Sequence, residues 1–236
     1  MKKLFVKGMR HGVPIMLGYL SVSFGFGVLC VQKNLSILAA VGISVTNLTS
    51  AGQVAGVGVI AAGGTLLEMI LCQLVINLRY SLMSLSLSQR LDPSFTLAHR
   101  LIAGYGVTDE IFAVASAQPE SIKPAYMYGL IFTPFLGWSL GTLFGAVAGD
   151  IMPASVGAAL SLMLYGMFIA IIIPPAKKSR KVLFAVILAG AVSILLHYVL
   201  PDLSSGFAVI ISALVSSLVT ALIFPIDTGE RGEEQA

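Results

Sequence analysis

Long charge-free stretches recur along the chain, and they define the elements that the sequence predicts. They run over 11–32, 34–67, 69–78, 124–149, 151–176, 182–201 and 203–226. A helix needs about 20 mostly apolar residues to cross a bilayer, and most of these stretches are that long. Because lipid tails cannot hydrogen-bond a backbone, such stretches must be helical. The pattern predicts helices near 12–31, 36–61, 65–88, 124–148, 154–174, 181–200 and 205–225.

The composition agrees with a membrane protein. Of the 236 residues, 57% are hydrophobic and only 11% are charged, against roughly 25% charged in an ordinary soluble domain. This excludes a soluble globular protein and a disordered chain, and a net charge of +3 is too small for a nucleic-acid-binding surface. The predicted fold class is an all-α polytopic membrane protein, with one transmembrane domain over 1–225 and a polar, acidic tail over 226–236.

The basic residues predict the orientation, because loops rich in Lys and Arg stay in the cytoplasm. One cluster lies within 2–10 and a second within 177–181. The first precedes an apolar run, as in a secretory signal, but the run continues to Cys30 without a clear small-x-small cleavage site. We therefore predict an uncleaved first span, with both termini in the cytoplasm.

The number of crossings has two interpretations, six or eight, which differ only in the region before Pro124. In the eight-crossing version, 36–61 and 101–118 both span the membrane, and Arg90 and Arg100 lie outside. In the six-crossing version, both segments are broken or re-entrant. That version fits the charge rule better, because it turns four basic residues towards the cytoplasm. They are Arg79, Arg90, Arg100 and Lys123.

Two segments carry helix-breaking or polar residues where lipid would demand apolar ones. The first, near 45–54, reads V-T-N-L-T-S-A-G-Q-V. It is either a helix with a buried polar face or an unwound stretch that lines a cavity, where Asn47, Ser50 and Gln53 would face a transported molecule. The second, 101–118, contains Gly-Tyr-Gly before Thr108 and Asp109, either of which is a plausible N-cap of a half-helix whose positive end points into the protein.

A row of glycines marks the predicted helix 124–148. Gly137, Gly141, Gly145 and Gly149 recur every four residues and therefore share one helical face. Such small-residue faces let two helices approach closely in a membrane. The glycines are interpreted as a static packing face or, alternatively, as a seam along which bundles slide.

Charged residues inside a membrane are expensive and usually functional. The candidates are Glu68, Arg79, Asp109 and Glu110. Arg79 and Asn77 lie near the middle of the span 65–88, although a shifted register would let Arg79 snorkel to the cytoplasmic interface. Of the adjacent Asp109 and Glu110, one could pair with Arg79 while the other faces a cavity or caps a helix; alternatively both are solvated on a loop. Burial disfavours the charged form of a carboxylate and raises its pKa, which would suit a proton carrier.

The remaining residue types argue against catalysis and metal binding. Cys30 and Cys72 lie in separate apolar runs, and His11, His99 and His197 form no cluster with metal-ligand spacing. No nucleotide-binding or hydrolase motif is present in the sequence. We predict no cofactor, no metal and no enzymatic activity.

Several motifs, in order over roughly 8–115, resemble those of the AzlC branched-chain amino acid permeases. They are G-V-P-I-M-L-G-Y (12–19), F-G-F-G-V-L (24–29), S-A-G-Q-V (50–54), I-N-L-R-Y-S-L (76–82) and T-D-E-I-F-A (108–113). Val54 replaces the more usual aromatic residue, and the part after Pro124 agrees with the family in length and hydropathy but in few specific residues.

The resemblance implies a bacterial inner-membrane exporter of valine, isoleucine or leucine, with methionine as a further candidate. It also implies a small partner membrane protein of the AzlD type and coupling to the proton gradient. In our hypothesis, Arg79 and half-helix N-termini bind the substrate carboxylate, and Asp109 or Glu110 binds its ammonium group. The candidate substrate-binding residues are Asn47, Ser50, Gln53, Asn77, Arg79 and Asp109, and the proton-coupling candidates are Asp109 and Glu110.

Other functions stay open at this point. A non-transporting scaffold or assembly subunit would tolerate the loss of Arg79 and Asp109, and a transporter of another small solute would share the same architecture. An intramembrane enzyme would need a nucleophile–base pair, and the sequence shows no recognisable one. A channel would be excluded by saturable, coupled flux.

Overall fold

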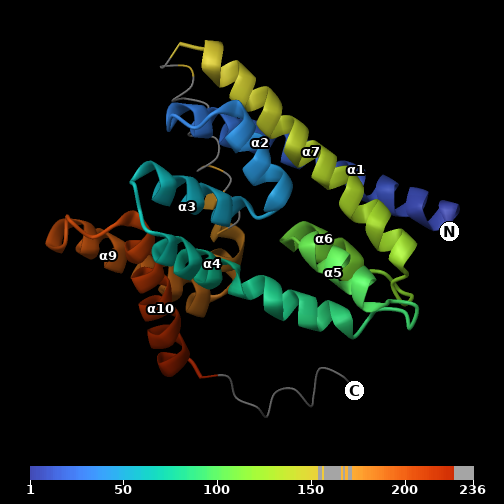
Figure 1. Cartoon of the computed structure of the whole chain (residues 1–236). Coiled ribbons are helices and arrows are strands. Elements are labelled where there is room, and N and C mark those ends of the chain that lie inside the picture. The colour runs from blue at the N-terminus through green and yellow to red at the C-terminus, as the bar shows by residue number, and fades with distance from the viewer. Residues whose placement is uncertain (154–155, 157–165, 167, 170–171, 226–236) are drawn as a thin grey trace.

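The computed structural model describes residues 1–153, 156, 166, 168–169 and 172–225, and its regular elements are α-helices. Their bounds follow in chain order (Figure 1). They are α1 (Lys2–Gln32), α2 (Ile37–Thr46), α3 (Ser50–Ala61), α4 (Leu66–Ser88), α5 (Leu97–Tyr105), α6 (Asp109–Ser116), α7 (Pro124–Ile151), α9 (Arg180–Val199) and α10 (Ser205–Ile223). Among the described residues, α1, α4, α7, α9 and α10 are long and apolar enough to cross a membrane. This confirms the all-α polytopic membrane fold; the predicted helix 154–174 falls mostly, and the tail 226–236 wholly, outside the described residues.

Hydroxyl side chains begin most of the helices. Every described helix except α1 and α7 starts after a Ser or Thr whose oxygen accepts a hydrogen bond from a backbone N–H in the first turn. Such caps satisfy N–H groups that have no partner within the helix, which matters most where no water is available. The caps are Ser36, Thr49, Thr65, Thr96, Thr108, Ser179 and Ser204.

Helices α1 and α7 pack side by side and run in the same direction. A Cβ atom built on Gly129 would lie 2.0 Å from the carbonyl oxygen of Phe5, and one on Gly145 would lie 1.9 Å from that of Phe24. The two backbones therefore touch along most of their length, as small residues allow in membranes. Helix α1 begins at Lys2 rather than near residue 12 because Gly8 already packs against α7.

Helix α4 crosses in the opposite direction to α1 and α7. Just after α4, the Arg90 guanidinium donates to the carbonyl of Gln118 (2.6 Å), and the Arg90 carbonyl accepts from the N–H of Ile122 (2.9 Å). Because Ile122 precedes α7, α4 ends where α7 begins. Helix α4 therefore starts at the opposite end, where α1 and α7 finish.

The segment α2–α3 enters and leaves at one end of the molecule. Helix α2 follows α1 and runs back beside α7, where the hydroxyl oxygens of Ser44 and Thr142 lie 2.7 Å apart. Helix α3 then returns beside α4: its N-cap Thr49 contacts Asn77 in the middle of α4, and a short loop joins its end to the start of α4. The segment 36–61 is therefore a re-entrant hairpin (Figure 1).

The segment α5–α6 is a second hairpin, inserted from the other end. It follows α4, reaches Thr108 in the interior beside Tyr19 of α1, and returns so that Ser116 contacts Arg90. The structure thus agrees with the six-crossing interpretation of the region before Pro124. Helix plus hairpin occurs twice, as α1–α2–α3 and as α4–α5–α6, with opposite orientations, which is the inverted-repeat arrangement found in many transporters.

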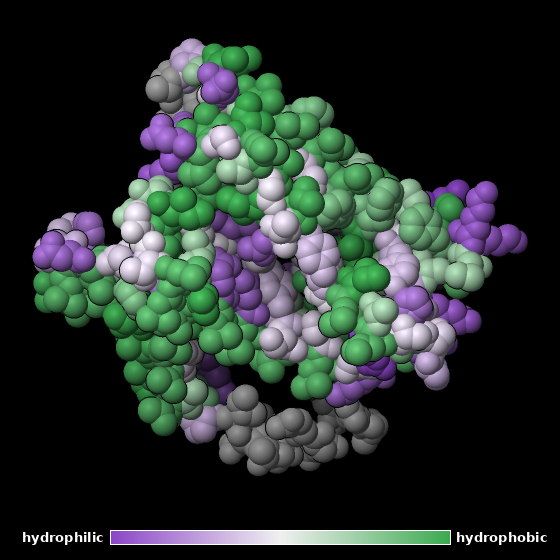
Figure 2. Space-filling model, viewed as in Figure 1, coloured by the Kyte–Doolittle hydropathy of each residue, from purple (hydrophilic) through white to green (hydrophobic). Residues whose placement is uncertain are grey.

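Apolar side chains cover much of the outside, as lipid contact requires (Figure 2). No residue in the apolar window of α9 is buried within the described structure. Along α4, leucines including Leu74, Leu78 and Leu82 are each more than half exposed. These surfaces are suited to lipid or to another membrane protein.

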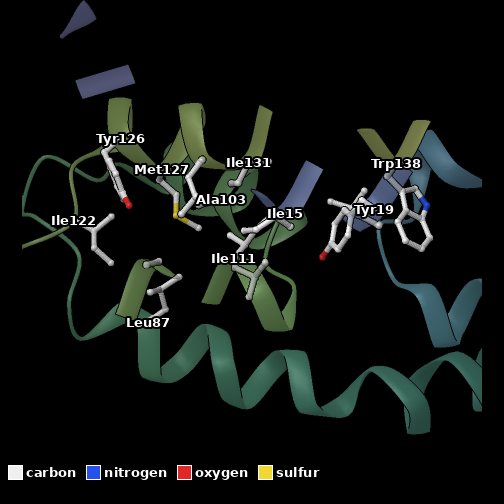
Figure 3. Packing of buried hydrophobic residues seen from close by; sticks show 14 of the residues in the cluster. Ile15, Tyr19, Leu87, Ala103, Ile111, Ile122, Tyr126, Met127, Ile131 and Trp138 are labelled. Atoms are coloured by element: carbon white, nitrogen blue, oxygen red, sulfur yellow. The ribbon is translucent and has the colours of Figure 1, made fainter. Parts of the chain in front are cut away.

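The main apolar core holds the second hairpin against α1 and α7 (Figure 3). Ile111 of α6, Met127 of α7 and Ile15 of α1 belong to one cluster of buried side chains. Gly106 lets the hairpin approach closely, since a Cβ atom there would lie 2.4 Å from Ile131. This packing fixes the depth at which α6 begins.

Glu68 anchors α10 to the rest of the protein. Its side chain is 2% exposed, and its Oε1 accepts hydrogen bonds from Ser204 Oγ (2.5 Å) and from the N–H of Gly206 (3.1 Å). The carboxylate therefore lies at the positive N-terminus of α10 as well as in the first turn of α4.

We expect Glu68→Ala to destabilise the protein, because it leaves two donors at the start of α10 unpaired, at about 1–3 kcal/mol for each buried group. The measurement is the midpoint of thermal unfolding in detergent, followed by size-exclusion chromatography. Glu120→Ala, at an exposed loop position, is the control. Equal midpoints for both variants would contradict this role of Glu68.

Candidate functional site

The tips of the two hairpins meet near the centre of the structure. The first tip is residues 47–49, between α2 and α3, and the second tip is residues 106–108, between α5 and α6. The hydroxyl of Tyr105, at the end of α5, donates to the carbonyl of Val45, near the end of α2, so the two hairpins are in contact beside their tips. Both predicted breaks are confirmed. Figure 2 shows hydrophilic residues gathered in a hollow at the centre of this face, within an apolar surround.

The first tip unwinds because its side chains replace the helical hydrogen bonds. Asn47 and Thr49 have extended backbones, and Thr49 caps α3. The amide nitrogen of Gln53 donates to the carbonyl of Asn47, which follows the end of α2, and to that of Ile43, which also accepts the backbone N–H of Asn47. Gln53 is 1% exposed, and its Oε1 accepts from the indole N–H of Trp138 at 3.0 Å. Gln53 therefore holds the break in place.

Polar side chains of α4 fasten the first turn of α3. Thr49 Oγ1 donates to Asn77 Oδ1 (2.8 Å), and Asn77 Nδ2 donates to Gln73 Oε1 (3.0 Å). Gln73 in turn donates to the carbonyl of Gly52 (2.7 Å). Asn77 thus lies at the first tip. Gln73 was not among the predicted residues, although its place one turn before Asn77 on the same helical face could have indicated it.

Arg79 forms an ion pair with Asp109 at the second tip. The distance between Arg79 Nη1 and Asp109 Oδ2 is 2.9 Å, and each side chain is 43% exposed. The guanidinium also lies 4.9 Å from the ring centroid of Tyr80. Asn77, two residues earlier on α4, contacts Thr49 of the first tip. Arg79 therefore lies at the depth of the tips rather than at the membrane interface. Asp109 is the first residue of α6, whose positive end also favours its charge.

Glu110 turns away from this ion pair and contacts α1. The Tyr19 hydroxyl lies 2.5 Å from Glu110 Oε2 and 2.6 Å from Thr108 Oγ1. The Tyr19 ring packs edge-on against Trp138, with centroids 5.1 Å apart (Figure 3). Tyr19 and Trp138 were not predicted as site residues, because a tyrosine and a tryptophan in apolar spans resemble ordinary core residues.

The other predicted residues lie as follows. Ser50 is half-buried in the first turn of α3, where the first backbone N–H groups of a helix have no partner within it. Gly137, Gly141, Gly145 and Gly149 lie against α1, away from the tips. Among the described residues there is no cluster of three His, Cys, Asp or Glu side chains that could hold a metal ion.

The site thus combines two broken hairpins, an intramembrane ion pair and a second carboxylate. Comparison with known proteins finds membrane proteins. The inner membrane protein YgaZ of Escherichia coli (strain K12) is 27% identical over 227 residues, which cover 93% of this chain and 90% of that protein. An uncharacterized membrane protein of Archaeoglobus fulgidus is 31% identical over 232 residues, covering 98% of this chain and 96% of that protein. No solved structure gives a significant match. A family model described as AzlC protein matches residues 14–152, and the chain therefore belongs to the AzlC family of membrane proteins.

Proposed function

We propose that this protein is a secondary transporter that exports branched-chain amino acids across a bacterial inner membrane, driven by the proton gradient. The observation that carries the proposal is the Arg79–Asp109 ion pair, held at 2.9 Å where two re-entrant tips meet. Charges at membrane depth are costly and are retained where they serve transport. Broken helices at this depth are typical of substrate sites in transporters.

The substrate is a zwitterion that inserts between the two residues of the ion pair. Its carboxylate binds Arg79 and the free N–H groups at the start of α3, next to Ser50, while its ammonium group binds Asp109. The substrate carboxylate replaces Asp109 as the partner of Arg79, and the substrate ammonium group replaces Arg79 as the partner of Asp109. An amino acid therefore enters the membrane centre without adding net charge. Asn77 and Gln53 position the first tip, and Asn47 lies at its edge.

A small membrane partner of the AzlD type completes the transporter in this proposal. Each side chain of the ion pair is 43% exposed although the pair lies at the depth of the tips, and charged groups are costly in contact with lipid. A partner protein would cover them.

The positive-inside rule supports a cytoplasmic position for the end of the molecule at which α1 begins. Basic residues lie at that end, at Lys2, Lys3, Lys7, Arg90 and Lys123.

The proposal is tested by export. The chain is expressed with and without an AzlD-type partner in cells that lack other exporters, and the cells receive a valine-containing dipeptide. We expect intracellular valine to fall and external valine to rise only when both proteins are present. If both proteins are in the membrane and valine is not exported, the same assay with other small amino acids tests whether the substrate is different. No export of any of them would favour the scaffold alternative.

A further inference from the structure

The second tip contains a carboxylate that the ion pair does not use. Glu110 follows Asp109 in the first turn of α6, but it contacts Tyr19 of α1 instead of Arg79 of α4. Tyr19 is 9% exposed and Thr108, its other partner, is 3% exposed. Glu110 itself is exposed in the described structure.

The hydrogen bonds around Tyr19 depend on whether Glu110 carries a proton. A phenol has one proton to donate, yet its oxygen lies 2.5 Å from Glu110 Oε2 and 2.6 Å from Thr108 Oγ1. With Glu110 ionised, Tyr19 donates to Glu110 and Thr108 donates to Tyr19. With Glu110 protonated, Glu110 donates to Tyr19 and Tyr19 donates to Thr108. Protonation thus reverses the chain and releases the Thr108 hydroxyl proton for another acceptor.

Glu110, unlike Asp109, takes no part in an ion pair, so a change in its protonation leaves the Arg79–Asp109 pair intact. Arg79 neutralises Asp109, so a proton on Asp109 would leave the guanidinium unpaired. Among the described residues, Glu110 has no cation within ion-pair distance. Helices α1, α4 and α7 pack against α6. Tyr19 of α1 contacts Glu110, and Tyr19 itself lies near Tyr80 of α4 and packs against the uncharged Trp138 of α7.

We propose that Glu110, Tyr19 and Thr108 form the proton site of this transporter, separate from the Arg79–Asp109 substrate site. The inference rests on the proposed function. The step is the addition of one proton to the Glu110 carboxylate, with no other bond made or broken except the reversed hydrogen bonds. The two adjacent acids then have different roles: Asp109 binds the substrate ammonium group, and Glu110 binds the proton.

Tyr19 also connects the proton site to the first tip. Its ring packs against Trp138 (Figure 3). The indole N–H of Trp138 donates to Gln53, and Gln53 donates to the carbonyl of Asn47. A change at Glu110 therefore reaches the opposite hairpin through side chains in contact. Trp138 is the one tryptophan of the chain, so its fluorescence reports on this connection.

The first experiment records Trp138 emission of the full chain in nanodiscs as the pH is varied. We expect a single-proton step in the wild type and in Asp109→Asn. The step is absent in Glu110→Gln, because the glutamine amide does not titrate, and in Tyr19→Phe, which keeps the ring but loses the hydroxyl. Glu120→Gln and Tyr198→Phe are matched controls at exposed positions and keep the step. A step in Glu110→Gln equal to that of the wild type, or no step in the wild type, would overturn the proposal.

A second measurement separates this inference from the proposed function. In proteoliposomes that contain the chain, with its partner if export requires one, we expect Glu110→Gln to retain valine counterflow and to lose accumulation driven by a proton gradient. Intact driven accumulation in this variant would remove Glu110 as the proton site while leaving valine transport established. No counterflow in the wild type would count against the proposed substrate, while the pH-dependent emission would still decide the proton site.

Discussion

Neutralising Asp109 is expected to abolish valine export while the chain stays inserted in the membrane. Asp109→Asn removes the anion that we assign to the substrate ammonium group and leaves Arg79 without its partner. Breaking a fully buried ion pair costs about 3–5 kcal/mol, and a smaller cost is expected here because both side chains are 43% exposed. Export is measured as external valine over time, and insertion is measured as the amount of chain in the membrane fraction.

A double variant separates the structural role of the pair from its role in binding. Arg79→Gln together with Asp109→Asn has no unpaired charge, so its thermal stability should exceed that of either single variant. It should still not export valine, because both substrate anchors are gone. Asp202→Asn, the same substitution at an exposed position between α9 and α10, is the control. Normal export by the double variant would mean that the pair serves structure alone.

Enlarging Gly145 is expected to prevent the protein from folding. A Cβ atom there would lie 1.9 Å from the carbonyl oxygen of Phe24, and this obstacle is backbone that cannot rotate away. Ordinary overpacking costs about 1–3 kcal/mol, and Gly145→Leu must also separate α1 from α7. We expect almost no folded protein by size-exclusion chromatography of a detergent extract.

Substitutions of two further glycines serve as comparisons for Gly145→Leu. Gly18→Leu, on the same α1–α7 pair, places its side chain where nothing lies within 4 Å and should be tolerated. Gly149→Ala should be mild, because its Cβ would lie 3.1 Å from the Cα of Val28, near the looser end of the pair. If Gly145→Leu folded as well as Gly18→Leu, the close approach of α1 and α7 would not be essential.

The local features of this protein could be predicted from the sequence because lipid imposes simple rules on single segments. Charge-free stretches of sufficient length must be helical, so α4, α7, α9 and α10 were predicted to within a few residues. The breaks at Asn47–Thr49 and Gly106–Thr108 were also predicted, since polar and glycine residues at membrane depth are incompatible with a continuous lipid-facing helix.

Only the tertiary structure decided how these segments meet. The choice between six and eight crossings depended on where α4 ends, which the contact of Arg90 with the chain before α7 settles. The division between Asp109 and Glu110 arose because adjacent residues on a helix point to different neighbours, here Arg79 on α4 and Tyr19 on α1. The sequence by itself thus determined which segments are helical and where they break. Packing between residues far apart in the chain decided which side chains share a site. Hydropathy describes single segments and carries no information about such contacts.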